Sequence, residues 1–198
     1  MDHRLTVNGD VYYIDWKNIQ QLILLPVCGF DFTGNFGTAS SKGVELELQY
    51  QPIPSFRFAL GSAYNEAMLT STVTGSQGNV GDTLENAPKW TGNATAEYHV
   101  DFNSEISGFA RMDFNTTSHE HNNFDPTTIY YNLPGYSLAN LRIGAKQNRF
   151  QSSLFVNNLF NKHAETALYE SYAINLPTAR RIGLNRPRTI GIDLRCDW

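Results

Sequence analysis

Four arginines are concentrated near the end of the chain, in the stretch "TARRIGLNRPR". Guanidinium groups bind anions through several planar donors, so this group could attract an anionic ligand. Solvated loop charge is the simpler interpretation of each arginine taken singly. We keep the ligand-attracting loop as a prediction; its members are Arg180, Arg181, Arg186 and Arg188.

A second polar group lies in "SHEHNNFD", which contains His119, Glu120, His121 and Asp125. On an extended backbone alternate side chains share a face, so His119 and His121 could hold a metal ion together. No second cluster supplies the missing ligands. We therefore favour a polar loop that contains two histidines, and we predict no metal site.

The two cysteines, Cys28 and Cys196, lack the CxxC spacing of a zinc site. An even count would allow one disulfide in an oxidising compartment, but two residues are weak support for it. The sequence also contains no nucleophile elbow, phosphate loop or paired-carboxylate spacing. We expect no enzymatic activity and no bound cofactor.

The composition suits a chain dominated by strands. Of the 198 residues only 17% are charged and 13% are aromatic, with 15 glycines, 10 tyrosines and 12 phenylalanines. The net charge of −4 argues against a nucleic-acid partner. No apolar run is long enough for a spanning helix, and the N-terminus is not a secretory signal.

Strict alternation of apolar and polar residues, typical of half-buried strands, recurs along the chain. In residues 43–50, for example, Val44, Leu46 and Leu48 alternate with Glu45 and Glu47. The parity of the first strand is blurred around its two adjacent tyrosines. The predicted strands are residues 4–16, 43–50, 55–65, 90–100, 105–115, 137–147, 150–160 and 186–198.

The connections alternate in length, with the short turns "QPIPS", "DFNS" and "QNR" separating long polar loops. Short periplasmic turns and long extracellular loops are the layout of a bacterial outer-membrane barrel. The sequence therefore predicts an all-β, antiparallel, up-and-down transmembrane β-barrel segment of about eight strands. The long loops are expected at Lys17–Lys42, Ala67–Lys89, Thr116–Gly135 and Asn161–Pro187.

The closing strand has a clean apolar face that ends on an aromatic residue. This face is expected to meet lipid, with its last residue at the periplasmic interface, where aromatic side chains are favoured. Cys28 would then lie in the first extracellular loop, a membrane height from Cys196, so we predict that both cysteines are free. The face consists of Ile190, Ile192, Leu194, Cys196 and Trp198.

Five fragments, in order along the chain, resemble the C-terminal barrel part of TonB-dependent outer-membrane receptors. They are "VNGDVYYIDWKNIQQL", "NFGTASSKGVELELQYQP", "LENAPKWTGNATAEY", "SSLFVNNLFNKH" and "NRPRTIGIDLRCDW". The chain departs from the family in ending on Trp198 instead of phenylalanine. It also has no counterpart of the family's plug domain, and it supplies about eight of the family's 22 strands.

The resemblance implies that residues 1–198 are the C-terminal part of such a barrel, in the bacterial outer membrane. It implies import of a scarce small-molecule ligand, such as an iron–siderophore complex, a vitamin or a glycan. The TonB complex would act only through the missing plug, so we expect no active uptake by this chain alone. The apolar face of the closing strand would be the signal recognised by the barrel-assembly machinery.

The polar side chains at alternate positions of the strands would face the lumen, either as a hydrated wall or as contacts to substrate or plug. They contain Glu45, Glu47, Glu97, His99, Arg111, Asp113, Arg142, Lys146, Asp193 and Arg195. Two other classes of protein stay open. One is a standalone eight-stranded outer-membrane barrel with a structural or adhesive role. The other is a soluble, lipocalin-like ligand binder.

Overall fold

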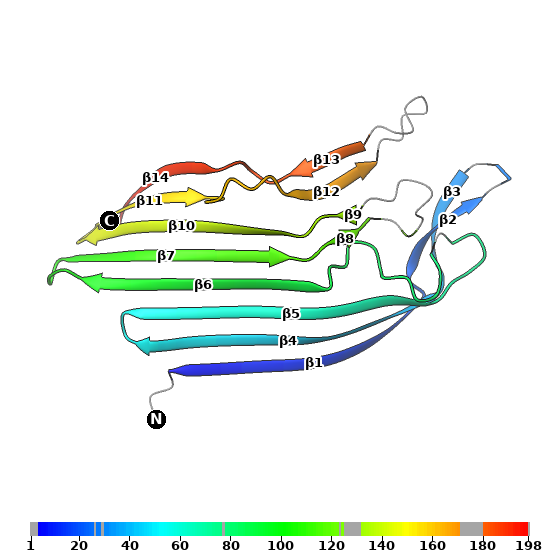
Figure 1. Cartoon of the computed structure of the whole chain (residues 1–198), viewed down its shortest axis with the longest axis horizontal. Coiled ribbons are helices and arrows are strands. Elements are labelled where there is room, and N and C mark those ends of the chain that lie inside the picture. Colours follow the sequence, from blue (N-terminus) through cyan, green and yellow to red (C-terminus); the bar gives the residue numbers. More distant parts are fainter. Residues whose placement is uncertain are drawn as a thin grey trace.

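The computed structural model describes residues 4–25, 27–28, 30–76, 78–122, 124, 132–170 and 180–197, which are built from strands and their connections (Figure 1). Within these residues there is no helix that is long and apolar enough to span a membrane. Trp198 and Asp125, both singled out from the sequence, lie outside the described residues.

One antiparallel sheet of eight strands forms the body of the molecule, with the order β1-β4-β5-β6-β7-β10-β11-β14. Sequential strands are neighbours throughout, as the up-and-down prediction requires. The strands are β1 (Leu5–Lys17), β4 (Thr38–Ile53), β5 (Phe56–Ser71), β6 (Trp90–Asp101), β7 (Ile106–Thr117), β10 (Tyr136–Gln147), β11 (Phe150–Asn157) and β14 (Thr189–Cys196).

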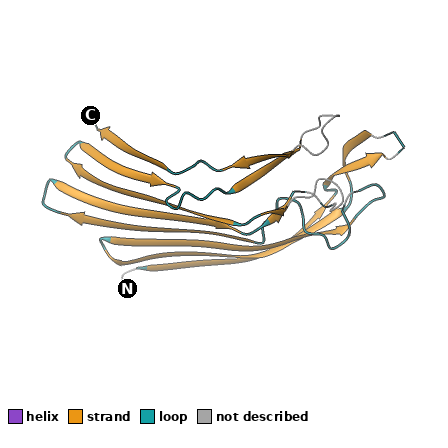
Figure 2. Cartoon of the chain, turned by 45° about the horizontal axis from the view of Figure 1, so that its top comes forward, coloured by secondary structure: helices purple, strands orange, loops and turns teal. Residues whose placement is uncertain are grey.

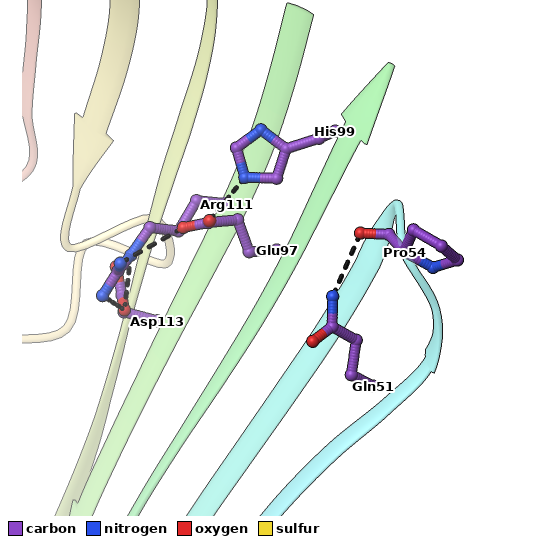
Figure 3. A network of polar contacts seen from close by, with 6 residues as sticks. All are labelled: Gln51, Pro54, Glu97, His99, Arg111 and Asp113. Carbon is purple, nitrogen blue, oxygen red and sulfur yellow. Dashed lines mark hydrogen bonds and ion pairs between the residues drawn. The ribbon is translucent and has the colours of Figure 1, made fainter. Parts of the chain in front are cut away.

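Tight turns join the strands at one end of the sheet and long connections join them at the other. The turns are residues 54–55, 102–105 and 148–149, and we call this the short-turn end. Gln51 braces the first turn by donating a hydrogen bond to the carbonyl of Pro54 at 3.2 Å (Figure 3). The opposite, long-loop end carries the connections after β1, β5, β7 and β11.

The long connections contain more strand than the sequence suggested. Three additional two-stranded sheets lie there: β2 (Gln20–Leu25) with β3 (Phe30–Asn35), β8 (Glu120–His121) with β9 (Asn132–Leu133), and β12 (Glu165–Glu170) with β13 (Arg180–Leu184). The predicted loop limits were also too wide, because β4 begins at Thr38 and β5 continues to Ser71. These ends have no apolar alternation. They are held by two ladders, since β1–β4 runs to Lys17 opposite Thr38 and β4–β5 runs to Thr38 opposite Ser71.

The seventh strand, whose alternation is ambiguous in the sequence, is shorter than predicted. β11 ends at Asn157, whereas the predicted strand runs to Phe160. Asn158 has a φ of 54°, in the left-handed region, so the backbone cannot continue as a strand through this residue.

The register between the strands places the alternating apolar side chains of all eight strands on one face of the sheet. A single row of paired residues crosses the whole sheet and is apolar at every position. Many members of this apolar face are exposed; Val11, Ile190 and Leu194, for example, are 82%, 70% and 78% exposed. The row is Leu5, Tyr50, Phe58, Ala96, Met112, Leu141, Val156 and Ile190.

The sheet is curved, and β1 and β14 form its two end strands (Figure 2). No ladder joins β1 to β14 within the described part of the chain. The principal buried cluster is small and lies at the long-loop end, where Ile19, Ala39 and Leu69 pack with Leu84 and Phe124. Within the described residues no layer packs against either face of the sheet, so burial of its apolar face must come from outside these residues.

Candidate functional site

The second face of the sheet carries the polar parities predicted from the sequence. A row of paired positions crosses its middle strands as Arg57, Glu97, Arg111 and Arg142. Glu97 thus lies between two arginines of neighbouring strands, which favours cross-strand ion pairs, whereas Arg111 and Arg142 are like charges. We call this surface the polar face.

An ion-pair cluster lies on β6 and β7, towards the short-turn end, and consists of Glu97, His99, Arg111 and Asp113 (Figure 3). The Arg111 guanidinium donates to Asp113 at 2.8 Å through Nη2 and to Glu97 at 3.3 Å through Nη1. The other oxygen of Glu97 lies 2.6 Å from Nε2 of His99. One arginine thereby joins two carboxylates that would otherwise repel each other.

Further polar contacts continue from the ion-pair cluster towards β14. Thr95 donates to Asp113 at 2.9 Å, which fixes the carboxylate beside the arginine. Arg142 on β10 donates to Asp193 on β14 at 3.3 Å, and its guanidinium lies 5.3 Å from the ring centroid of Phe155. This half of the polar face therefore satisfies much of its charge internally.

Two aromatic side chains on the same half lie across glycines of the neighbouring strand. Phe109 is paired with Gly144 and Phe155 with Gly191. A Cβ atom at Gly144 would lie 2.6 Å from the Phe109 ring and 2.6 Å from the carbonyl oxygen of Ser152, and one at Gly191 would lie 2.4 Å from the Phe155 ring. The rings occupy the space that the missing side chains leave, a packing known to support glycine in sheets.

The β1–β4 part of the polar face contrasts with this arrangement. Asp10 and Glu45 are directly paired across the two strands, and Glu47 follows on the same face of β4. Within the described residues none of these three side chains forms an ion pair or hydrogen bond. We call them the unpaired carboxylates.

A hollow of about 180 Å³ adjoins the unpaired carboxylates. Glu45 and Glu47 line it together with Gly61, Ala63 and Asn93 of the next two strands. The small residues of β5 leave the space open, and the two carboxylates give it a negative potential. A cationic side chain that is not part of the described chain would fit both features.

Sequence reasoning identified Glu45 and Glu47 but missed Asp10. The two adjacent tyrosines blurred the parity of the first strand, so the face of Asp10 was not assigned. The structure resolves this ambiguity, because the hydroxyl of Tyr12 donates to Asn65 on the polar face at 3.1 Å. Tyr12 and Asp10 differ by two positions on one strand and therefore share that face.

The arginine group lies at the long-loop end. Arg180 and Arg181 belong to β13, paired with Glu170 and Tyr169 of β12, while Arg186 and Arg188 follow β13 before β14 begins. The side chain of Arg180 is outside the described part. Arg181, Arg186 and Arg188 are exposed, and no ion pair within the described residues involves them. Their guanidinium groups are therefore accessible to an anion.

The histidine group has protein partners. His121 donates from Nε2 to the carbonyl of Thr83 at 3.0 Å, which ties β8 to the connection after β5. Burial raises the pKa of the neighbouring Glu120, and the charge of His121 opposes this only in part. No group of three or more potential metal ligands occurs in the described residues. Asp125 lies outside those residues.

The closing strand presents its predicted apolar face. Ile190, Ile192, Leu194 and Cys196 are all exposed there. Cys196 pairs with Phe150 at the short-turn end, whereas Cys28 lies in the turn between β2 and β3 at the long-loop end. Both cysteines are free.

Solved structures share this fold over the whole chain. The ferric yersiniabactin uptake receptor FyuA from Yersinia pestis matches 100% of it with a TM-score of 0.79 and 19% identity. The ferric preacinetobactin receptor BauA from Acinetobacter baumannii matches 100% with a TM-score of 0.73 and 20% identity. The ferric-catecholate import receptor Fiu from E. coli K12 matches 99% with a TM-score of 0.71 and 17% identity.

The chain covers 28% of the first two receptors and 26% of the third. No curated protein matches it by sequence. The family model for the TonB dependent receptor-like β-barrel matches residues 1–159, which is most of the chain. The ladder order, the common apolar face and this match agree, and the chain belongs to the TonB-dependent receptor-like β-barrel family of the bacterial outer membrane.

Proposed function

We propose that residues 1–198 are the C-terminal part of the barrel of a TonB-dependent importer, whose plug and remaining barrel strands lie outside this sequence. The observation that carries the proposal is the apolar row that crosses all eight strands. A face of this size needs lipid to cover it. The end strands β1 and β14 would pair with the other strands of the barrel.

The proposed ligand is a scarce small molecule, with an iron–siderophore complex as the favoured class and a vitamin or glycan as others. Three matched receptors are named for ferric yersiniabactin, ferric preacinetobactin and ferric catecholates. In this chain the exposed side chains of Arg181, Arg186 and Arg188 would attract an anionic form of the ligand at the long-loop end. The long-loop end would then be extracellular.

The unpaired carboxylates would contact the plug inside the completed barrel. Asp10, Glu45 and Glu47 have no cationic partner among the described residues, and the hollow beside Glu45 and Glu47 would accept a basic plug side chain. The TonB complex would act on the plug and would not touch this chain. The chain by itself would therefore not perform energy-dependent uptake.

The test of this function is import by the complete receptor. Cells that express the full reading frame should accumulate an iron–siderophore complex in an energy-dependent manner, and cells that express residues 1–198 alone should not. Replacing Arg181, Arg186 and Arg188 together by glutamine should raise the ligand concentration needed for half-maximal uptake. Import by residues 1–198 alone would contradict the proposal.

The apolar residues at the end of the chain, in β14 and after it in the sequence, would also be the signal for the barrel-assembly machinery; they are Ile190, Ile192, Leu194, Cys196 and Trp198. Leu194→Gln should reduce the amount of protein recovered in the outer-membrane fraction. Arg195→Gln, one residue further and on the polar face, is the matched control and should not. Equal recovery of both variants would argue against this role.

A standalone eight-stranded barrel is the alternative, and it is not favoured. It would require β14 to pair with β1, and the described residues contain no such ladder. The genomic sequence upstream of Met1 separates the two. A continuous reading frame into a plug domain supports the importer, and a signal peptide directly before Met1 supports the small barrel.

A further inference from the structure

Two ladders meet where the last long connection leaves the sheet. The β11–β14 ladder ends at Asn157 opposite Thr189, and the β12–β13 ladder begins at Glu165 opposite Leu184. Between them lie residues 158–164 on one side and 185–188 on the other, so regular pairing cannot continue through two segments of such different length. Their backbone groups need other hydrogen-bond partners.

Asn158 supplies several of these partners and is only 5% exposed. Its side-chain oxygen accepts a hydrogen bond from the amide of Lys162 at 2.8 Å. Its side-chain nitrogen donates to the carbonyl of Lys162 at 2.9 Å and to that of Arg186 at 3.1 Å. Its own amide donates to the side-chain oxygen of Asn140 on β10 at 2.9 Å. One side chain thus ties both segments together, and its backbone anchors them to the sheet.

Two more asparagines complete the junction. Asn161 accepts from the amide of Arg188 at 3.0 Å, and Asn185 accepts from the amide of Ala164 at 2.8 Å. Asn185 also donates to the carbonyl of Arg186 at 3.1 Å. The backbone of Arg186 is therefore held by two asparagine side chains, and that of Arg188 by a third.

The sequence contained both parts of this arrangement separately, as "NNLFNK" and as the arginine-rich stretch. We propose that Asn158 is a positioning residue that, through the carbonyl of Arg186, holds the segment containing Arg186 and Arg188 in a fixed place at the mouth of the barrel for an anionic ligand. The ligand part of this inference rests on the proposed function. Arg186 and Arg188 are exposed and held by their backbones, so their side chains stay available to the ligand.

The chemistry of the position explains why asparagine is needed. Its φ of 54° is tolerated by asparagine, aspartate and glycine, whereas most other residues are strained there. Aspartate would keep the shape and the acceptor for Lys162 but would lose both donated hydrogen bonds. Glycine would keep the backbone conformation and lose every side-chain contact. Asn158→Asp and Asn158→Gly therefore both remove the contact to the carbonyl of Arg186 without imposing a forbidden backbone conformation.

Asn157→Asp is the matched control for the added charge. Asn157 is the adjacent residue, is exposed, and forms no side-chain hydrogen bond within the described residues. A negative charge at this position should affect anion binding through electrostatics alone. A difference between the two aspartate variants would thus report the lost contacts.

The experiment uses the full chain in detergent micelles, with amide hydrogen exchange and titration of a trisulfonated pyrene dye as the anionic probe. In Asn158→Gly, exchange at Lys162 should accelerate about tenfold, which corresponds to loss of about one buried hydrogen bond. In Asn158→Asp the acceptor for this amide is kept, so exchange at Lys162 should change less. Exchange at Arg188 should accelerate in both variants, because both release the carbonyl of Arg186. Exchange in the β4–β5 ladder should stay unchanged. Dye affinity should fall about threefold more in Asn158→Asp than in Asn157→Asp, because the arginines are no longer held together.

Unchanged exchange at Arg188 in both Asn158 variants would overturn the proposal, as would equal dye affinity in Asn158→Asp and Asn157→Asp. A general loss of protection that includes β4–β5 would also overturn it, since the residue would then support the fold as a whole. Failure of the parent chain to bind the dye would count against the arginines as a ligand-attracting group. Exchange at Lys162 and Arg188 would then decide the positioning role by itself.

Discussion

The two halves of the polar face differ in whether their charged side chains form ion pairs. On β6 and β7, Arg111 joins Glu97 and Asp113, and His99 lies against Glu97. On β1 and β4, the unpaired carboxylates have no cation within the described residues, although Asp10 and Glu45 are directly paired in the ladder. The first half satisfies its own charge, and the second leaves negative charge for another molecule or domain to neutralise.

This difference separates structural charges from charges that are available for binding. An ion pair between two strands of the sheet contributes to the stability of the sheet and adds nothing to recognition of a partner. Unpaired like charges on neighbouring strands cost stability and are retained where a partner offsets the cost. Under the proposed function that partner is the plug, and the hollow next to Glu45 and Glu47 is where a cation would enter.

Glycine substitutions should show the largest contrast between the two halves. Gly144→Ala should lower the free energy of unfolding by about 2 kcal/mol, because a Cβ atom would meet both a ring and a backbone oxygen. Gly61→Ala, on the other half, should change it by less than about 0.5 kcal/mol, because the new atom meets only the side chain of Asn93. Urea unfolding in micelles measures both.

Equal destabilisation by these two alanine substitutions would contradict the comparison. It would mean that the β4–β5 half is packed as tightly as the half that contains Phe109, so that the hollow is not open to a partner.

Removing a charged side chain should change the free energy of unfolding in opposite directions in the two halves. Arg111→Gln should reduce the free energy of unfolding by about 1 kcal/mol, a modest value because the side chain is 44% exposed. Glu45→Gln should raise it by about 0.3 kcal/mol, because it removes the repulsion between this residue and Asp10. The measurement is the urea midpoint of each variant at low ionic strength.

Added salt provides the control for these two substitutions. It should diminish both differences, because both are electrostatic. A loss of stability in Glu45→Gln similar to that in Arg111→Gln would show that Glu45 already has a cationic partner.

The smallest expected effect concerns pH and a carboxylate outside the sheet. Burial raises the pKa of Glu120, so the folded chain holds this proton more tightly than the unfolded chain does. Its contribution to stability is therefore present below the ordinary glutamate pKa and is lost as pH rises through the raised value. Glu120→Gln should make stability less dependent on pH in that range, as measured by unfolding at a series of pH values. An unchanged pH dependence would show that Glu120 is not appreciably buried.

Much of the architecture could be predicted because the chain obeys a period of two wherever one face is apolar. The eight strands, their order and the alternation of short and long connections were confirmed. The predictions were wrong where the apolar pattern stops. β4 and β5 continue beyond it at Thr38 and Ser71, and β11 ends early at a left-handed asparagine. Ladder hydrogen bonds and local backbone geometry set these limits, and neither leaves a period-two signal.

The candidate sites were less predictable than the fold. The sequence identified the arginines and the carboxylates of β4 as separate groups, and it gave no role to the asparagines of "NNLFNK". Their relations depend on residues far apart in the chain, such as Asp10 with Glu45 and Asn158 with Arg186. No local pattern encodes such contacts. The ligand-attracting loop and the assembly signal stay predictions.

By itself the sequence determined which side chains share a face, because successive residues of a strand point to opposite sides whatever their neighbours are. It also determined the direction of the strands, through the lengths of their connections. The tertiary structure alone decided which charges are neutralised. That outcome depends on the register between strands, since a shift by one residue would have exchanged the two faces and separated Arg111 from Glu97.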